Sequence, residues 1–180
     1  MASMKLKGKT AVLLIAEGYY EHEYWYPYYR FLEEGAEVIT AGITPGIVRG
    51  EGIHGTDGLK AEVKVAVSDL KTDAFDILFL PGGIYGPMEL RDNDGVLDLV
   101  RKCFKENKLV CTICHSPWIL VSAGVLKGRK ITCPRDISAD VIGAGAEFIF
   151  QPVVVDGNLL SAEAYFSMPE MFRALFDIYF

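Results

Sequence analysis

Short uninterrupted runs of apolar residues recur along this 180-residue chain. Clear examples are TAVLLIA at residues 10–16, DILFL at 76–80 and KLVCTI at 108–113. A run of this length is typical of a strand that is buried on both faces, as in a parallel sheet covered by helices on each side. The stretches between the runs have helical spacing. The alternation predicts an α/β fold, a three-layer sandwich in which a mostly parallel sheet has helices on both faces.

The remaining elements follow from the same patterns and from the residues that break them. Helices are expected at residues 23–34, 95–106, 117–124 and 137–143, and a last helix is expected after Ser167, which with Glu170 has the spacing of a capping box. Further strands are expected at 37–41, 59–67 and 130–132 and as a hairpin around 156–158, whereas the many Gly and Pro residues at 43–58 predict a loop.

Composition excludes several classes of protein. The chain is 51% hydrophobic and 23% charged, which excludes an intrinsically disordered segment. Its length is that of one domain, here residues 1–180. The 18 Lys and Arg residues against 24 Asp and Glu residues give a net charge of −6 without a basic cluster, so binding to nucleic acid or to an anionic membrane is not expected. No apolar run reaches the ~18–20 residues that cross a bilayer.

The amino-terminal sequence lacks the apolar stretch of a signal peptide, so a cytoplasmic protein is expected. Met4 offers a second start, which would make residues 1–3 a leader. Without an export signal the four cysteines are expected to be reduced and to be either core residues or catalytic residues. The three histidines are scattered, so no metal site and no cofactor are expected. The cysteines are Cys103, Cys111, Cys114 and Cys133.

Three loops that follow predicted strands have unusual content. Residues 17–23 (EGYYEHE) follow the first strand, Pro81-Gly82-Gly83 follows the strand at 77–80, and Cys114-His115-Ser116-Pro117 follows the strand at 109–113. In open α/β sheets, ligands bind at the carboxyl ends of the strands. An acid, a glycine turn and a thiol are therefore expected to meet at one edge of the sheet.

Cys114 is the main candidate for chemistry. It lies between a buried strand and a helix start, the position of a nucleophile elbow, where free N–H groups are expected to lower the thiol pKa. A buried structural cysteine is the alternative, since free cysteine is among the most buried residue types. Cys111 and Cys114 also form a Cys-x-x-Cys pair. Because Cys111 falls inside the strand, we favour a core residue over a thioredoxin-like redox pair.

The neighbours of the thiol each have two readings. His115 is a candidate general base or acid with a backbone N–H for an oxyanion, or it points to a partner or to solvent. Gly82 and Gly83 either let the backbone approach a ligand or form a plain turn. Glu21 and Glu23 compete as the partner of the thiol, and helix capping is the other explanation for both.

An aromatic cluster precedes and enters the first helix. Six of the nine tyrosines fall between Tyr19 and Tyr29, together with Trp25. Such a cluster either lines a pocket or packs on the core or at a dimer contact. The two other histidines, His22 and His54, give weak signals on loops.

Five segments together resemble the ThiJ/PfpI family, which is akin to the class I glutamine amidotransferases and includes archaeal intracellular proteases and the Parkinson-linked protein deglycase. The segments extend over nearly the whole chain. The resemblance implies a flavodoxin-like sandwich and a homodimer or higher homo-oligomer. The segments are EYWYP at 23–27, LPGG at 80–83, ICHSP at 113–117, SAGVLKGRK at 122–130 and VVVDGN at 153–158.

The same resemblance implies roles for individual residues. Cys114 would be the nucleophile, and Glu23 would be the carboxylic acid that contacts its sulfur. The backbone N–H groups of Gly83 and His115 would form the oxyanion site. The candidate pocket residues are Gly82, Ser116 and Tyr20.

Several positions depart from the pattern of the family. Ser116 replaces a glycine that usually follows Cys-His. Met88, with Glu89 one step away, stands where the protease branch has a glutamate contributed by a neighbouring subunit, which argues against protease activity. Pro134 stands where many members bring a histidine or tyrosine near the thiol, and Met168 stands where the plant glyoxalase-like branch has a histidine.

The leading hypothesis is a cofactor-free cysteine enzyme that acts on small reactive carbonyls as a glyoxalase or deglycase. Cys114 would add to the aldehyde to give a hemithioacetal, and Glu23 or His115 would move the proton needed for rearrangement to a hydroxy acid. One alternative is a PfpI-type peptidase or amidase that acts on peptides. Another is a redox sensor or chaperone-like stress protein, in which Cys114 is oxidised to a sulfinic acid.

Overall fold

The computed structural model describes residues 4–52 and 57–180, so the predicted leader at residues 1–3 and His54 lie outside the described residues. Among these described residues, the central sheet has seven strands: β1 (Thr10–Leu14), β2 (Glu37–Gly42), β5 (Val65–Ala66), β6 (Ile77–Leu80), β7 (Leu109–Ile113), β10 (Val153–Asp156) and β11 (Leu159–Ala162). Their order is β10-β11-β7-β6-β1-β2-β5. All neighbours are parallel except β10 and β11, which form the predicted antiparallel hairpin.

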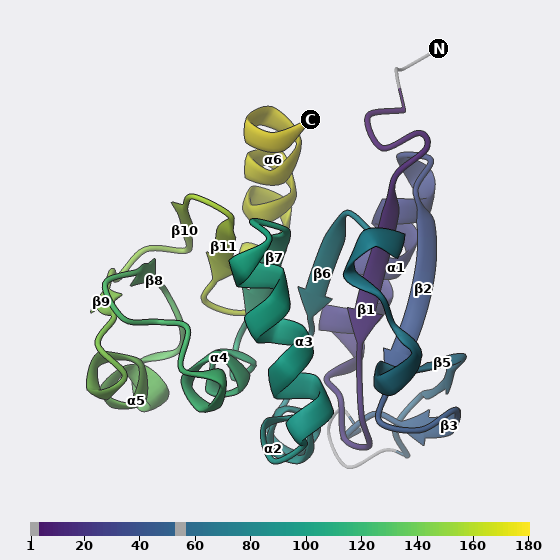
Figure 1. Cartoon of the computed structure of the whole chain (residues 1–180), viewed down its shortest axis with the longest axis horizontal. Coiled ribbons are helices and arrows are strands. Elements are labelled where there is room, and N and C mark those ends of the chain that lie inside the picture. The colour runs from purple at the N-terminus through teal and green to yellow at the C-terminus, as the bar shows by residue number, and fades with distance from the viewer. Residues whose placement is uncertain (1–3, 53–56) are drawn as a thin grey trace.

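Helices cover both faces of this sheet (Figure 1). On one face lie α1 (Glu21–Glu33) and α6 (Met168–Tyr179), and on the other lie α2 (Tyr85–Arg91), α3 (Asp94–Lys105), α4 (Pro117–Ala123) and α5 (Ser138–Gly143). Side chains alternate along β1: Leu13 packs in the same cluster as Phe31 of α1, whereas Leu14 packs in the same cluster as Val100 of α3. The predicted three-layer α/β sandwich is confirmed.

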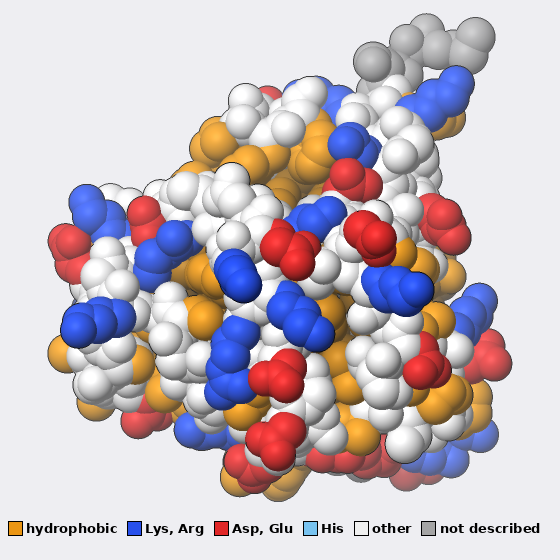
Figure 2. Space-filling model, viewed as in Figure 1, with side chains coloured by type: hydrophobic (Ala, Val, Ile, Leu, Met, Phe, Trp, Pro, Cys, Tyr) orange, Lys and Arg blue, Asp and Glu red, His pale blue; other side chains and the backbone are white. Residues whose placement is uncertain are grey.

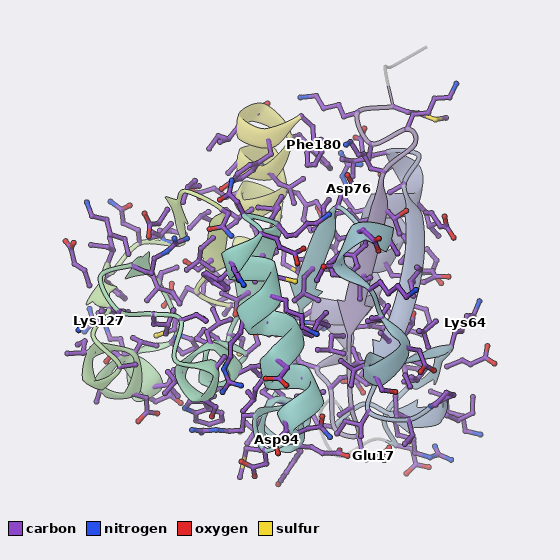
Figure 3. The ribbon with its side chains drawn as sticks, viewed as in Figure 1. Glu17, Lys64, Asp76, Asp94, Lys127 and Phe180 are labelled. Carbon is purple, nitrogen blue, oxygen red and sulfur yellow. The ribbon has the colours of Figure 1, made fainter. Side chains whose placement is uncertain are left out.

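The parallel strands all end at one edge of the sheet, the lower edge in Figure 1. Figure 3 labels Asp76, which precedes β6 and lies toward the upper edge, and Glu17, which follows β1 and lies at the lower edge. Asp76 accepts hydrogen bonds from the backbone N–H of Thr10 and from Lys9 Nζ, both at 3.0 Å, and thereby ties the starts of β1 and β6 together.

The surface carries charges of both signs. Figure 2 shows Lys and Arg side chains intermingled with Asp and Glu side chains on the face that α3 covers. Within residues 4–52 and 57–180, no helix is both long enough and apolar enough to cross a membrane.

The segment 43–58, predicted as a loop, contains a strand. β3 (Gly46–Arg49) pairs in antiparallel fashion with β4 (Lys60–Val63). The strand predicted at 59–67 is correspondingly divided at Lys64 into β4 and β5. β3 is short and mostly exposed, so no buried apolar pattern marks it, and its pairing with β4 is a contact that local composition does not show.

The carboxy-terminal half holds further differences. β9 (Glu147–Phe148) was not expected, and it pairs with β8 (Lys130–Ile131) outside the central sheet. The helix α2 was not expected either. The predicted capping box at α6 is wrong. Ser167 has helical backbone angles (φ −85°, ψ −8°) and makes no capping hydrogen bond, because the 3-10 turn at Tyr165–Ser167 runs directly into the helix, whereas a cap needs an extended residue.

Candidate active site

Cys114 follows β7 directly and has a φ of 58°, a left-handed conformation that side-chain-bearing residues rarely adopt. Ser116 holds this turn in place. Its completely buried hydroxyl donates to Leu80 O at 2.7 Å and accepts from Ile113 N at 2.9 Å. The end of β6 is thereby joined to the end of β7. Strand, strained turn and helix together have the form of the predicted nucleophile elbow.

Glu23 reaches the same point from α1 and is completely buried. Its Oε2 accepts a hydrogen bond from Gly82 N at 3.0 Å. A Cβ on Gly82 would collide with Glu23 Oε2 and with Cys114 Cβ, so only glycine lets the carboxyl and the thiol lie this close. Burial raises the pKa of Glu23 to about 8, and the carboxyl is therefore largely protonated at neutral pH. Its Oε1 has no hydrogen-bond partner among the described residues.

The predicted low pKa of Cys114 is wrong for this site. Burial raises the pKa of the thiol, and Glu23 raises it further when its carboxyl is ionised. The backbone N–H groups of Gly83 and His115 face the sulfur and act in the opposite direction, but they do not outweigh burial. The helix α4 begins at Pro117, beyond the thiol, and the effect of a helix end fades within one turn. The thiol is therefore protonated at neutral pH and requires a base.

His115 is the side chain placed to act as that base. Its Nδ1 lies 3.1 Å from Cys114 Sγ, and its Nε2 lies 3.0 Å from Asp136 Oδ2. An ionised carboxylate only accepts hydrogen bonds, so the proton of the neutral ring belongs on Nε2, and Nδ1 faces the thiol as an acceptor. Cys114, His115 and Asp136 thus form a series of hydrogen-bonded side chains in which a proton can pass from the sulfur to the imidazole.

Asp136 was not identified from the sequence as a residue of the site, because it lies on a segment distant in the chain from Cys114. It lies on a 3-10 turn at Arg135–Ile137, directly after Pro134, one of the positions that depart from the family pattern. Arg135 stacks on Phe150, with its guanidinium carbon 3.9 Å from the ring centre, and Ser138 Oγ donates to Arg135 O at 2.7 Å. These contacts hold the turn that presents Asp136 to His115.

A cavity of about 190 Å³ opens onto Cys114, Glu23, Gly83 and His115. Tyr20 lines this cavity as predicted, whereas Gly82 and Ser116, the other two candidate pocket residues, lie buried behind it. The rest of the lining was not expected from the sequence. These further residues are Glu51, Ile84, Ala164 and Tyr165.

Glu21 does not compete with Glu23. Its Oε1 accepts hydrogen bonds from Gly52 N at 3.1 Å and Leu59 N at 3.2 Å, so it links these two residues. Glu21, with His22 and Trp25, lines a separate cavity of about 400 Å³.

The aromatic cluster serves more than one place. Tyr19 and Tyr24 are core residues with 1% and 2% of their surface exposed, Tyr20 lines the Cys114 cavity, and Tyr29 is exposed. The pocket and core explanations each hold for part of the cluster.

The other cysteines are buried and free. Cys111 is completely buried in β7, as favoured over a redox pair. Burial raises the pKa of Cys103 and of Cys133 to about 12. Within the part of the chain that the structure describes, no group of three or more His, Cys, Asp or Glu residues is placed to hold a metal ion.

The two remaining departures from the family pattern do not line the cavity. Met88 and Glu89 are exposed residues of α2 and do not line the cavity. Met168 is buried at the start of α6.

The sequence model of the DJ-1/PfpI family matches residues 9–177. The chain belongs to the DJ-1/PfpI family. Deglycase PfpI of Pyrococcus furiosus is 43% identical over 151 residues, which are 84% of this chain and 87% of that protein. Protein/nucleic acid deglycase 2 of Escherichia coli is 36% identical over 154 residues, with 84% of this chain and 86% of that protein covered. The resemblance that the five segments indicated is confirmed.

Solved structures agree with this assignment. A two-domain protein of Anabaena variabilis, with a DJ-1/ThiJ/PfpI-like domain and a ferritin-like domain, superposes with a TM-score of 0.88 at 25% sequence identity. The superposition covers 94% of this chain and 47% of that protein, so this DJ-1/PfpI chain spans about half of its length.

Proposed function

We propose that this DJ-1/PfpI protein is a cysteine-dependent glyoxalase or deglycase for small reactive carbonyls. One observation carries the proposal: the cavity brings the Cys114 thiol together with a base at 3.1 Å, His115 Nδ1, and with the protonated carboxyl of Glu23. The two relatives described above are both named as deglycases, which supports the same class of activity.

The first step forms the carbon–sulfur bond. His115 Nδ1 takes the thiol proton, and the sulfur of Cys114 attacks the aldehyde carbon of a 2-oxoaldehyde such as methylglyoxal. The electron pair of the carbonyl moves to its oxygen. The N–H groups of Gly83 and His115 face the sulfur and are therefore suited to hold this oxyanion. Return of the proton from His115 to the oxygen gives a neutral hemithioacetal.

The second step moves hydrogen along the substrate. One proton must leave the former aldehyde carbon and one must reach the neighbouring carbon. The hydroxyl proton on the former aldehyde carbon is also lost, and the neighbouring carbonyl oxygen gains one. Glu23 lines the cavity, and its pKa of about 8 lets the carboxyl both give and take a proton near neutral pH. The rearranged product is a lactoyl thioester of Cys114. Water cleaves this thioester to lactate and restores the thiol.

The test is lactate formation from methylglyoxal by the wild-type protein and by Cys114→Ala. Wild type is expected to form lactate, and the variant is expected to lose at least ~10³-fold in kcat/KM, since it lacks the atom that bonds to substrate. Equal rates for the two proteins, or no reaction with either, would contradict the proposal.

Amide hydrolysis is a second candidate, favoured by the series Cys114–His115–Asp136. A thiol, a base and an acid that orients the base are the groups a cysteine hydrolase needs, and all three come from one chain here. Cleavage of fluorogenic peptides that disappears in Cys114→Ala would support this candidate.

We also expect a homodimer or higher homo-oligomer, which light scattering of the purified protein measures.

A further inference from the structure

We infer that the Cys114 cavity selects uncharged carbonyl compounds over anionic ones, and that Glu51 is the residue that sets this selectivity. The substrate class named here rests on the proposed function. The charge selectivity is a property of the cavity and can be measured without turnover.

The carboxylates around the cavity are the first observation. The described lining includes two of them, Glu23 and Glu51, and neither lysine nor arginine is among the described lining residues. Asp136 adds another carboxylate, 3.0 Å from His115 Nε2. An anionic group on a ligand therefore finds acidic side chains in the described lining and no lysine or arginine to pair with. Because Glu23 is largely protonated at neutral pH, Glu51 is the carboxylate of this lining that carries its charge into the site.

Glu51 is fixed beside the turn that faces the sulfur. Its Oε2 accepts a hydrogen bond from Ile84 N at 3.0 Å, and a Cβ on Gly83 would lie 3.2 Å from the same oxygen. Its own backbone N–H donates to Tyr19 O at 3.0 Å. Backbone and side chain are thus both anchored, so the charge stays next to the place where the carbonyl oxygen is expected to bind.

The charge of Glu51 is felt within the site. Burial is the main reason that the pKa values of Glu23 and Tyr20 are raised, and the negative charge of Glu51 adds to the rise at both groups. A charge that disfavours a carboxylate at Glu23 disfavours the carboxylate or phosphate of a ligand in the same cavity for the same reason.

The small size of the cavity makes this repulsion effective. At ~30 Å³ per water molecule, a cavity of about 190 Å³ has the space of about six waters, which suits a ligand of a few heavy atoms. A charged group on a ligand inside the cavity shares this small volume with Glu51, which is part of the lining. Two like charges about 6 Å apart, at an effective dielectric constant between about 20 and 80, repel enough to change a rate by about threefold to a hundredfold. Neutral 2-oxoaldehydes avoid this penalty, and 2-oxo acids and phosphorylated carbonyls do not.

Alkylation of Cys114 by a matched pair of reagents tests the inference. Iodoacetamide is neutral, iodoacetate is an anion, and both leave a carbon–sulfur bond and release iodide. The rate of modification of Cys114 is followed by mass spectrometry for wild type, Glu51→Gln and Glu89→Gln. For each protein, the rate with iodoacetamide is divided by the rate with iodoacetate. This ratio is then divided by the same ratio for an uncharged cysteine peptide in the same buffer. At one pH, differences in the thiolate population cancel from this ratio. Glu89→Gln is the control, since it removes a carboxylate that does not line the cavity.

For wild type at low salt, the normalised ratio is expected to be about tenfold or more in favour of iodoacetamide. Glu51→Gln is expected to lower the ratio about three- to tenfold, and Glu89→Gln is expected to leave it unchanged. A normalised ratio near one, a ratio that Glu51→Gln does not change, or a Cys114 that iodoacetamide does not modify would each overturn the inference. If the ratio behaves as expected while methylglyoxal is not converted to lactate, the proposed function fails and the selectivity stands.

Discussion

The contact between Asp136 and His115 leads to a specific prediction for Asp136→Asn. An asparagine at this position can donate its amide N–H to His115 Nε2, which an aspartate cannot do. The imidazole then carries its proton on Nδ1 and presents a donor to Cys114 where the wild type presents an acceptor. The variant is therefore expected to lose activity while its structure is retained.

The structure sets the size of the loss. A hydrogen bond to a charged group contributes ~1.5–3 kcal/mol, but the Asp136 side chain is 65% exposed and solvent screens the pair, so ~1–2 kcal/mol is the expected cost of the wrong tautomer. At 1.36 kcal/mol per tenfold, kcat/KM falls about five- to thirtyfold. The free energy of unfolding changes by less than ~1 kcal/mol, because exposed pairs contribute little to stability.

The assay combines lactate formation from methylglyoxal with ¹⁵N NMR of the His115 ring. Rate and tautomer should change together, which a purely structural defect would not produce. Asp140→Asn is the matched control, since Asp140 is also exposed and accepts a ring N–H from Trp118 Nε1 at 2.7 Å without contacting His115. Equal losses in the two variants, or an unchanged tautomer in Asp136→Asn, would refute the reasoning.

Two further predictions concern the other groups of the site. The pKa of Glu23 is about 8 in the folded protein and near 4.5 in the unfolded chain, so between these pH values the folded state holds a proton that the unfolded chain has lost. As the pH rises from about 5 to about 8, the wild type should therefore lose ~2–4 kcal/mol of unfolding free energy relative to Glu23→Gln. Urea unfolding in which the two proteins show the same pH dependence would contradict this. Gly83 has a φ of +96°, and a Cβ there would lie 2.8 Å from Tyr20 N, so Gly83→Ala should abolish lactate formation and lower the free energy of unfolding by more than ~2 kcal/mol. Gly124 has a φ of +71° and open space around it, so Gly124→Ala should lower the free energy of unfolding by ~1 kcal/mol and keep activity. Similar unfolding curves for the two variants would be the contrary result.

Much of the site could be predicted because local patterns and sheet topology place it. Glu23, the Gly82-Gly83 turn and Cys114 each follow a strand that a short apolar run marks, and parallel strands end at one edge. No long-range information was needed to expect these groups to meet. The structure brings them together there.

The rest depends on tertiary packing that sequence patterns do not encode. Asp136 lies on a turn that is held by the contact between Arg135 and Phe150. Glu51 lies beside Gly52, which donates to Glu21, and its own side chain accepts from Ile84 N. Nothing nearby in the sequence marks either residue. The prediction of a lowered pKa for the Cys114 thiol was wrong for a related reason. A helix end can be recognised in the sequence, but the burial that outweighs it at Cys114 is a property of the assembled core.

The hydrogen bonds of the Ser116 hydroxyl separate the residues of the site that are fixed by the central strands from those that can be substituted. By joining Leu80 to Ile113, it makes the distance between the glycine turn and the thiol a property of two adjacent strands. Glu51 and Tyr165 are presented by segments outside those strands. Residues that select the ligand can therefore be exchanged, by evolution or by design, while the reacting centre keeps its alignment. Libraries aimed at new carbonyl substrates should vary the peripheral segments and leave Ser116 intact.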